Sequence, residues 1–120
     1  MAKILAIDDE PELLEQVKVF LEQEGHTVET ALDGPTGLQK VREFQPVLIL
    51  LDIIMPGMDG FEVLKRLSWK SETSQIPVIM LTAKGETESV FKAQGLSATD
   101  YLVKPFTAES LLEVVNRYAL

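Results

Sequence analysis

The chain has 120 residues, a length that holds one hydrophobic core and is too short for two. Its 19 acidic residues outnumber its 11 basic ones, and the net charge of -8 argues against a nucleic-acid surface, which needs clustered Lys and Arg. There is no Cys, which excludes disulfides and thiol chemistry, and no apolar segment reaches the length of a signal sequence or a membrane span. We therefore expect one domain over residues 1–120, located in the cytoplasm, with no contact to nucleic acid or a membrane.

Short apolar runs alternate along the chain with longer segments in which apolar residues recur every three or four positions. The runs predict strands at Lys3–Ile7, His26–Ala31, Val47–Leu51, Pro77–Leu81 and Asp100–Val103. The segments between and after them predict five helices, which include Leu13–Leu21, Leu38–Phe44, Phe61–Leu67, Gly85–Gly95 and Leu111–Tyr118. The expected order is a strand followed by a helix, five times.

Several residues typical of helix and turn boundaries agree with this division. Pro11 suits a first helical turn, Gly25 a helix exit, and Thr107 an N-cap, while Gly34 and Pro35 predict a turn. The strands are apolar throughout rather than alternating, as in parallel strands that are covered on both faces. The fold class is therefore α/β, with a doubly wound, five-stranded parallel sheet.

Polar side chains of reactive type follow four of the five predicted strands. Asp8 and Asp9 come after the first, Asp52 after the third, Thr82 after the fourth and Lys104 after the fifth. Each alone has a simpler interpretation, such as a helix cap, a turn residue or a solvated charge. The carboxyl ends of parallel strands meet at one edge of the sheet, which is where such sheets bind ligands. The five polar residues together therefore indicate a ligand-binding or catalytic site at this edge.

The composition of this cluster narrows its chemistry. Two carboxylates about 4 Å apart repel by roughly 4 kcal/mol at an effective dielectric near 20, so three of them need protons or a cation. Oxygen ligands without His or Cys favour Mg²⁺, which leaves room for a phosphate oxygen. Lys104 and the Thr82 hydroxyl suit further phosphate oxygens. The set favours phosphoryl transfer to an Asp, and Asp52, at the end of the most apolar strand, is the best nucleophile.

Four motifs resemble the CheY-like receiver domain of two-component response regulators in order and spacing. They are IDDE at 7–10, LLDIIMPGMDG at 50–60, LTA at 81–83 and YLVKPF at 101–106. The resemblance covers nearly the whole chain and implies a flavodoxin-like sheet with strand order 2-1-3-4-5. It also implies that Asp52 accepts a phosphoryl group from a histidine kinase or a histidine phosphotransfer protein.

The resemblance assigns roles to the other site residues as well. Asp9, Asp52 and the backbone carbonyl of Ile54 would ligate Mg²⁺, with Asp8 assisting through water. Thr82 and Lys104 would contact the phosphoryl group, and the bond between Lys104 and Pro105 would be cis.

Members of this family act as switches, and the resemblance implies the same parts here. The phosphoryl group would draw Thr82 inward, and Tyr101 would move from an exposed to a buried rotamer. The face formed by the fourth helix, fifth strand and fifth helix would then bind a different partner, either a downstream effector or an output domain. The chain itself would be a monomer or a weak phosphorylation-dependent dimer. Gly85–Gly95, which offers few apolar residues to bury, is the expected mobile helix.

Two other functional classes stay open at this point. A Mg²⁺-dependent aspartyl-phosphate hydrolase would need a second acid two residues after its nucleophile, where Ile54 stands. A flavodoxin-like FMN-binding protein would need a phosphate loop after the first strand, where acids stand instead. In the family, the position of Ile54 governs access of water, so its apolar side chain predicts slow loss of the phosphoryl group. Trp69 is expected to be a partly exposed loop residue, with a partner contact as the alternative.

Overall fold

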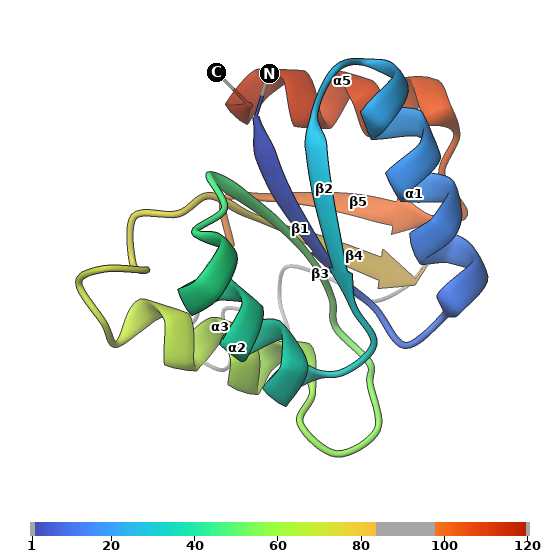
Figure 1. Cartoon of the computed structure of the whole chain (residues 1–120). Helices are drawn as coiled ribbons and strands as arrows, with labels where there is room; N and C mark the ends of the chain where they lie inside the picture. Colours follow the sequence, from blue (N-terminus) through green and yellow to red (C-terminus); the bar gives the residue numbers. More distant parts are fainter. Residues whose placement is uncertain (1, 84–97, 120) are drawn as a thin grey trace.

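The computed structural model describes residues 2–83 and 98–119, in which five parallel strands form one sheet. The spatial order is β2-β1-β3-β4-β5, which confirms the predicted order (Figure 1). The strands are β1 (Lys3–Ile7), β2 (Thr27–Ala31), β3 (Leu48–Asp52), β4 (Val78–Ala83) and β5 (Asp100–Lys104).

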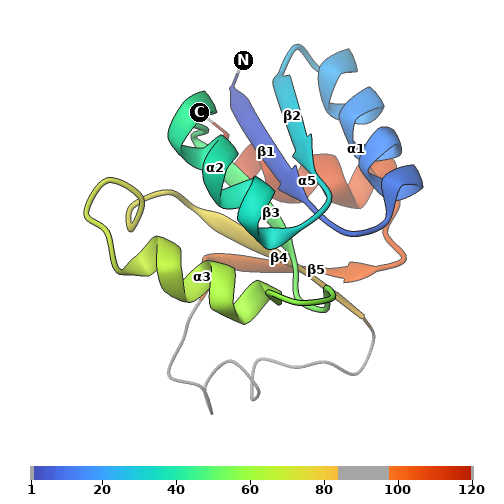
Figure 2. The ribbon, with the colours of Figure 1, turned by 60° about the horizontal axis from the view of Figure 1, so that its bottom comes forward.

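Four helices of the described residues cover the two faces of this sheet. They are α1 (Pro11–Gln23), α2 (Gly34–Phe44), α3 (Gly60–Ser68) and α5 (Ala108–Tyr118). Helices α1 and α5 lie on one face and α2 and α3 on the other, as the two views in Figures 1 and 2 show. The helix predicted at Gly85–Gly95 lies outside the described residues.

Each strand of the sheet contributes to two separate apolar layers. In β3, Leu48 and Leu50 pack with residues of α1 and α5, whereas Ile49 and Leu51 pack with residues of α2 and α3. All four side chains are fully buried. Burial on both faces explains why the strand sequences are apolar throughout, and it fixes the end of β3 firmly between two cores.

Local hydrogen bonds and proline geometry set the helix boundaries. One boundary prediction, the turn at Gly34 and Pro35, is wrong. Pro11 opens α1, and the Thr107 side chain accepts a hydrogen bond from the Ser110 N–H at the start of α5, as expected. Gly34 and Pro35, however, do not form a separate turn, because they are the first residues of α2. Asp33 caps this helix by accepting a hydrogen bond from the Thr36 N–H.

Three strands extend further toward their carboxyl ends than the apolar runs predict. Asp52 belongs to β3 and is paired with Leu81, while Thr82 and Lys104 belong to β4 and β5. The polar residues are thus held by the ladder of the sheet instead of following it in loops. Strand pairing fixes their backbone positions, which a loop would leave variable.

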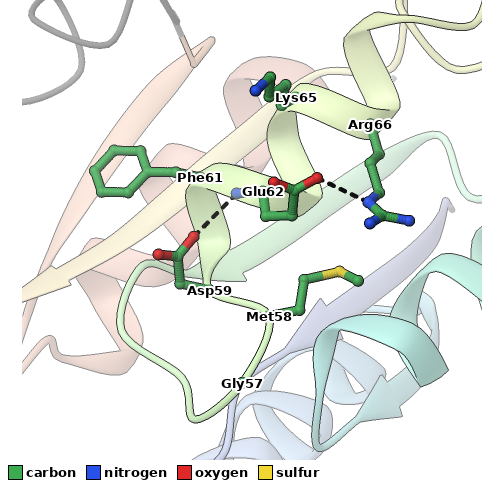
Figure 3. Close-up of a pocket in the computed structure, with 7 residues that line it drawn as sticks. All are labelled: Gly57, Met58, Asp59, Phe61, Glu62, Lys65 and Arg66. Carbon is green, nitrogen blue, oxygen red and sulfur yellow. Dashed lines mark hydrogen bonds and ion pairs between the residues drawn. The ribbon is translucent and has the colours of Figure 1, made fainter.

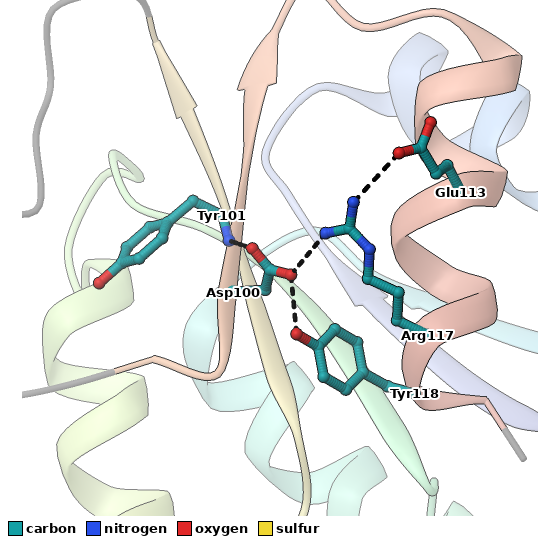
Figure 4. Close-up of polar contacts among 5 residues, drawn as sticks. All are labelled: Asp100, Tyr101, Glu113, Arg117 and Tyr118. Carbon is teal, nitrogen blue, oxygen red and sulfur yellow. Dashed lines mark hydrogen bonds and ion pairs between the residues drawn. The ribbon is translucent and has the colours of Figure 1, made fainter.

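Strand β5 is tied to the end of α5 by a polar network (Figure 4). Asp100 Oδ2 accepts hydrogen bonds from the Tyr118 hydroxyl at 2.8 Å and from Arg117 at 3.1 Å, and Arg117 also contacts Glu113. Burial opposes ionisation of Asp100, but these hydrogen bonds and that of the Tyr101 N–H hold its pKa below the usual value. Within the described part of the chain, no helix has both the length and the apolarity needed to cross a membrane.

Candidate functional site

Lys104 brings three of the acidic side chains together at the carboxyl edge of the sheet. Its Nζ atom lies 2.7 Å from Asp8 Oδ2 and 3.3 Å from Asp52 Oδ1. Glu10 Oε1 lies 3.0 Å from the same nitrogen atom. Residues from β5, β3 and the segment after β1 therefore converge on one ammonium group, as the positions of their strands predict.

Burial makes this cluster unfavourable electrostatically. Asp8 is fully buried and Asp52 is 6% exposed, although both carry carboxylates. Desolvation raises the pKa of Asp8 above its usual value, while Lys104 and the backbone N–H of Glu10 partly oppose the change. The cluster thus holds more negative charge than one Lys neutralises.

Asp52 has the most strongly perturbed carboxyl group of the site. Desolvation, followed by repulsion from Asp8, raises its pKa from 3.8 to about 7, although Lys104 acts in the opposite direction. Asp9 adds to the increase. Burial lowers the pKa of Lys104, but hydrogen bonds to Asp8 and Glu10 and the charges of Asp8 and Asp52 outweigh this effect and raise it. A second cation at this edge would favour ionised Asp52.

The other predicted residues lie around this cluster in different settings. Thr82 is buried in β4, one residue beyond the register partner of Asp52. Asp9 is exposed, and it is not the N-cap of α1, a position that Glu10 occupies without a side-chain hydrogen bond. Ile54 is 65% exposed in the loop after β3.

Tyr101 lies near the opposite end of β5 from Lys104 and is half-buried. In Figure 4 its ring lies on the other side of the strand from Asp100, and it packs at the edge of the α2 and α3 layer. The bond between Lys104 and Pro105 is cis, as the resemblance implies.

The loop between β3 and α3 folds back against the backbone of Asp52. The Gly60 N–H donates a 2.7 Å hydrogen bond to the Ile53 carbonyl, and a Cβ atom at Gly60 would collide with the Asp52 carbonyl oxygen. Asp59 caps α3 by accepting a hydrogen bond from the Glu62 N–H (Figure 3). Asp59 is thus a capping residue, and Gly60 allows the close approach of the loop to β3.

The donor set fits a divalent cation. One carboxylate oxygen each of Asp8, Asp9 and Glu10 lies within 4.8 Å of the other two. The buried Asp8 Oδ2 contacts Lys104 Nζ at 2.7 Å and has no other polar partner among the described residues. One buried carboxylate oxygen beside two exposed carboxylates, with an excess of negative charge, suits Mg²⁺.

Glu10 is the site residue that sequence reasoning missed. It belongs to the IDDE motif, but its position beside Pro11 at a helix start indicates a first-turn acid and nothing more. Only the fold brings residue 104 within 3.0 Å of it. The sequence carried no signal for this contact between residues so far apart.

Comparison with known proteins decides the family of this site. The model of the response regulator receiver domain matches residues 4–116. The chain belongs to this family. The receiver domain is 43% identical to the protein PilH of Pseudomonas aeruginosa over 97% of this chain and 96% of PilH. It is also similar to the solved structure of the chemotaxis protein CheY4 of Vibrio cholerae, with a TM-score of 0.90 and 37% identity over 98% of each chain.

Other relatives are longer than this receiver domain. The DNA-binding dual master transcriptional regulator RpaA of Synechocystis is 42% identical over 97% of this chain, but over only 48% of RpaA. The chain thus spans nearly all of PilH and about half of RpaA. Its relatives are response regulators of two-component systems, in which receiver domains are phosphorylation-activated signalling switches.

Proposed function

We propose that residues 1–120 form one receiver domain in which Asp52 is the phosphoacceptor. The observation that carries this proposal is the convergence of buried Asp52, buried Asp8 and Lys104 at the carboxyl edge of the sheet. The pKa of Asp52 is raised to about 7, so its carboxyl group exchanges a proton near neutral pH. An Asp held between two apolar layers is also fixed in position, as an attacking group must be.

Phosphorylation would consume a phosphohistidine of a histidine kinase or a histidine phosphotransfer protein. An Oδ atom of Asp52 attacks the phosphorus atom and forms a P–O bond. The P–N bond breaks, and its electron pair stays on the imidazole nitrogen, which takes a proton from solvent. The product is an acyl phosphate, and attack of water on its phosphorus atom later restores the carboxylate and releases inorganic phosphate. The chain would catalyse only these two reactions on itself, so it is not a classical enzyme.

Magnesium is the proposed cofactor, and when bound it would neutralise charge on the carboxylates and the phosphoryl oxygens. Asp9, Asp52 and the Ile54 carbonyl would ligate it, with Asp8 assisting through water. The cluster of Asp8, Asp9 and Glu10 carboxylates supports a cation at this edge of the sheet. Lys104, already 3.3 Å from Asp52 Oδ1, would turn to a phosphoryl oxygen.

The switch would use Thr82 and Tyr101. The Thr82 hydroxyl donates a hydrogen bond to the phosphoryl group, and Tyr101, half-buried in this structure, moves inward behind it. The face of β5, α5 and the predicted fourth helix then changes partners between two states a few kcal/mol apart. We propose a cytoplasmic monomer or weak phosphorylation-dependent dimer, whose partner is an effector protein or an output domain.

Residues of the same site argue against the two alternative functional classes, the hydrolase and the FMN-binding protein. An aspartyl-phosphate hydrolase lacks its second acid, because exposed and apolar Ile54 occupies that position. An FMN carrier would place a phosphate beside Asp8, Asp9 and Glu10, which repel it.

Incubation with acetyl phosphate and Mg²⁺, followed by mass spectrometry of the intact chain, tests the proposal. We expect one added phosphoryl group in the wild-type protein and none in Asp52→Asn. Asp59→Asn is the matched control, since Asp59 is an exposed carboxylate in the same region and should leave the modification unchanged. Modification of Asp52→Asn to the wild-type extent would contradict the assignment.

A further inference from the structure

A groove lies at the edge of the sheet opposite the Lys104 cluster. It follows the carboxyl ends of α2 and α3 and the loop that leads to β4, where strands β3 and β4 begin. One part is a cavity of about 190 Å³ lined by Leu38, Val41, Arg42, Arg66, Leu67, Trp69, Lys70 and Thr73. A second part of about 350 Å³ shares four of these residues, so the two parts adjoin.

The groove combines an apolar floor with a basic rim. Val41 and Leu67 are buried beneath it, whereas Trp69 is 67% exposed at its side. None of the described residues that line the smaller cavity is acidic, although the chain has 19 acids and only 11 bases.

Two of the rim charges have no counter-charge in the part of the chain that the structure describes. No acid of those residues pairs with Arg42 or Lys70. Arg66 is paired with Glu62 at 2.9 Å, and its side chain extends from α3 in Figure 3. Bases at the ends of α2 and α3 complement the helix dipoles, but the dipoles do not explain an exposed indole beside them.

Trp69 supplies the feature typical of a binding surface. Trp is enriched among the residues that contribute most to protein interfaces, and its ring here is held at one side by Lys65, whose Nζ atom lies 5.4 Å from the ring centre. A ring already held in place loses little freedom when a partner covers it.

The size of the groove indicates what it accommodates. Small-molecule pockets usually measure about 300–1,000 Å³, so the smaller cavity is too small for such a ligand but suits one apolar side chain. The neighbouring part continues the surface and is lined by Arg42 and Lys70 as well, together with one acid, Glu72. A chain segment that inserts one apolar residue and places acids along the rim satisfies both properties.

We propose that this groove binds an acidic segment of a partner protein, with one apolar or aromatic side chain seated beside Trp69. We infer an acidic partner from charge complementarity, because the lining of the smaller cavity is basic although the net charge of the chain is -8. The surface is separate from the Lys104 cluster, so the proposal stands whether or not Asp52 is phosphorylated.

The test uses capped synthetic peptides and the full chain. The first peptide alternates Glu and Asp around one central Phe, the second replaces Phe with Ser, and the third replaces the acids with Lys. Trp69 is the chain's only Trp, so its emission reports on the groove, and amide chemical shifts locate the contact independently. We expect the first peptide to shift the emission of Trp69 and the amides of the lining residues, and the other two peptides to have little effect.

Charge-reversed variants make the result specific. Lys70→Glu should weaken binding of the first peptide about tenfold, whereas Lys18→Glu, the same change on α1 at the other face, should alter it less than about twofold. Equal binding of the Lys peptide, equal losses in both variants, or no shift at all would overturn the proposal. Self-association of the chain that Lys70→Glu abolishes, without binding of any peptide, would also overturn it in favour of a second copy.

Discussion

Replacing Asp52 by Asn is expected to stabilise the metal-free protein at neutral pH. The folded-state pKa of Asp52 is raised from 3.8 to about 7, so the folded chain holds this proton more tightly than the unfolded chain. Wild-type protein should therefore lose stability as the pH rises from about 4 to about 7, and the loss is complete above that range. The Asn variant has no such proton and should lack this loss.

The magnitude follows from the same two values. The interval from 3.8 to about 7 corresponds to roughly 4 kcal/mol at 1.36 kcal/mol per pH unit. This is an upper limit, because water at the open edge of the sheet and movement of Lys104 both reduce the penalty. We expect the variant to gain at least about 1 kcal/mol over wild type between pH 4 and pH 8.

Urea unfolding in EDTA at several pH values measures this gain. The informative quantity is the difference in unfolding free energy between the two proteins, because groups that titrate in both, such as Asp33 and Asp100, cancel. Added Mg²⁺ at pH 8 should then stabilise wild type more than the variant. A difference that stays constant with pH, or that falls as the pH rises, would refute the electrostatic account of the site.

Three further changes probe the surroundings of Asp52. Gly60→Ala should destabilise the fold by about 1–3 kcal/mol in urea unfolding, since its Cβ atom collides with the Asp52 carbonyl, and unchanged stability would contradict the packing described. Glu10→Gln frees Lys104 from one carboxylate and should speed labelling by acetyl phosphate about two- to fivefold, measured by mass spectrometry; equal or slower labelling would count against competition for this Lys. Ile54→Asn should shorten the lifetime of the phosphorylated form, as the decay of the added mass will show; an equal lifetime would mean that Ile54 does not exclude water.

The sequence predicted the sheet because local and global signals agree in it. Runs such as Val47–Leu51 are apolar at every position, and only strands covered on both faces require this. Sheet order then followed from the motifs that surround Asp52 and Lys104. The helix expected at Gly85–Gly95 lies outside the described residues, so that prediction stays untested.

The errors arose where two physical effects compete for the same residues. Gly34 and Pro35 are typical of turns, but a capping Asp33 just before them makes the pair a favourable helix start. The strand ends were predicted too short because hydropathy falls at Asp52 while pairing with the next strand continues. Backbone hydrogen bonds do not depend on side-chain polarity, so hydropathy alone misses such ends.

Site chemistry was predictable from residue types, whereas contacts across the fold were not. Asp8, Asp52 and Lys104 are polar residues at ends of apolar strands, which is a visible signal. Glu10 carries no such signal, because it stands in an ordinary helix-boundary position. Trp69, expected to be a partly exposed loop residue, is 67% exposed at the end of α3. Their settings depend on how distant segments pack against each other.

The short strands set how the two ends of the molecule can influence each other. Strand β3 has five residues, and the four steps of about 3.3 Å between Leu48 and Asp52 span roughly 13 Å. Exposed charges are largely screened beyond about 8 Å at physiological salt. Charge added at one edge therefore reaches the basic groove at the other only weakly through solvent, and any influence between them has to travel as displacement of the packed side chains in between.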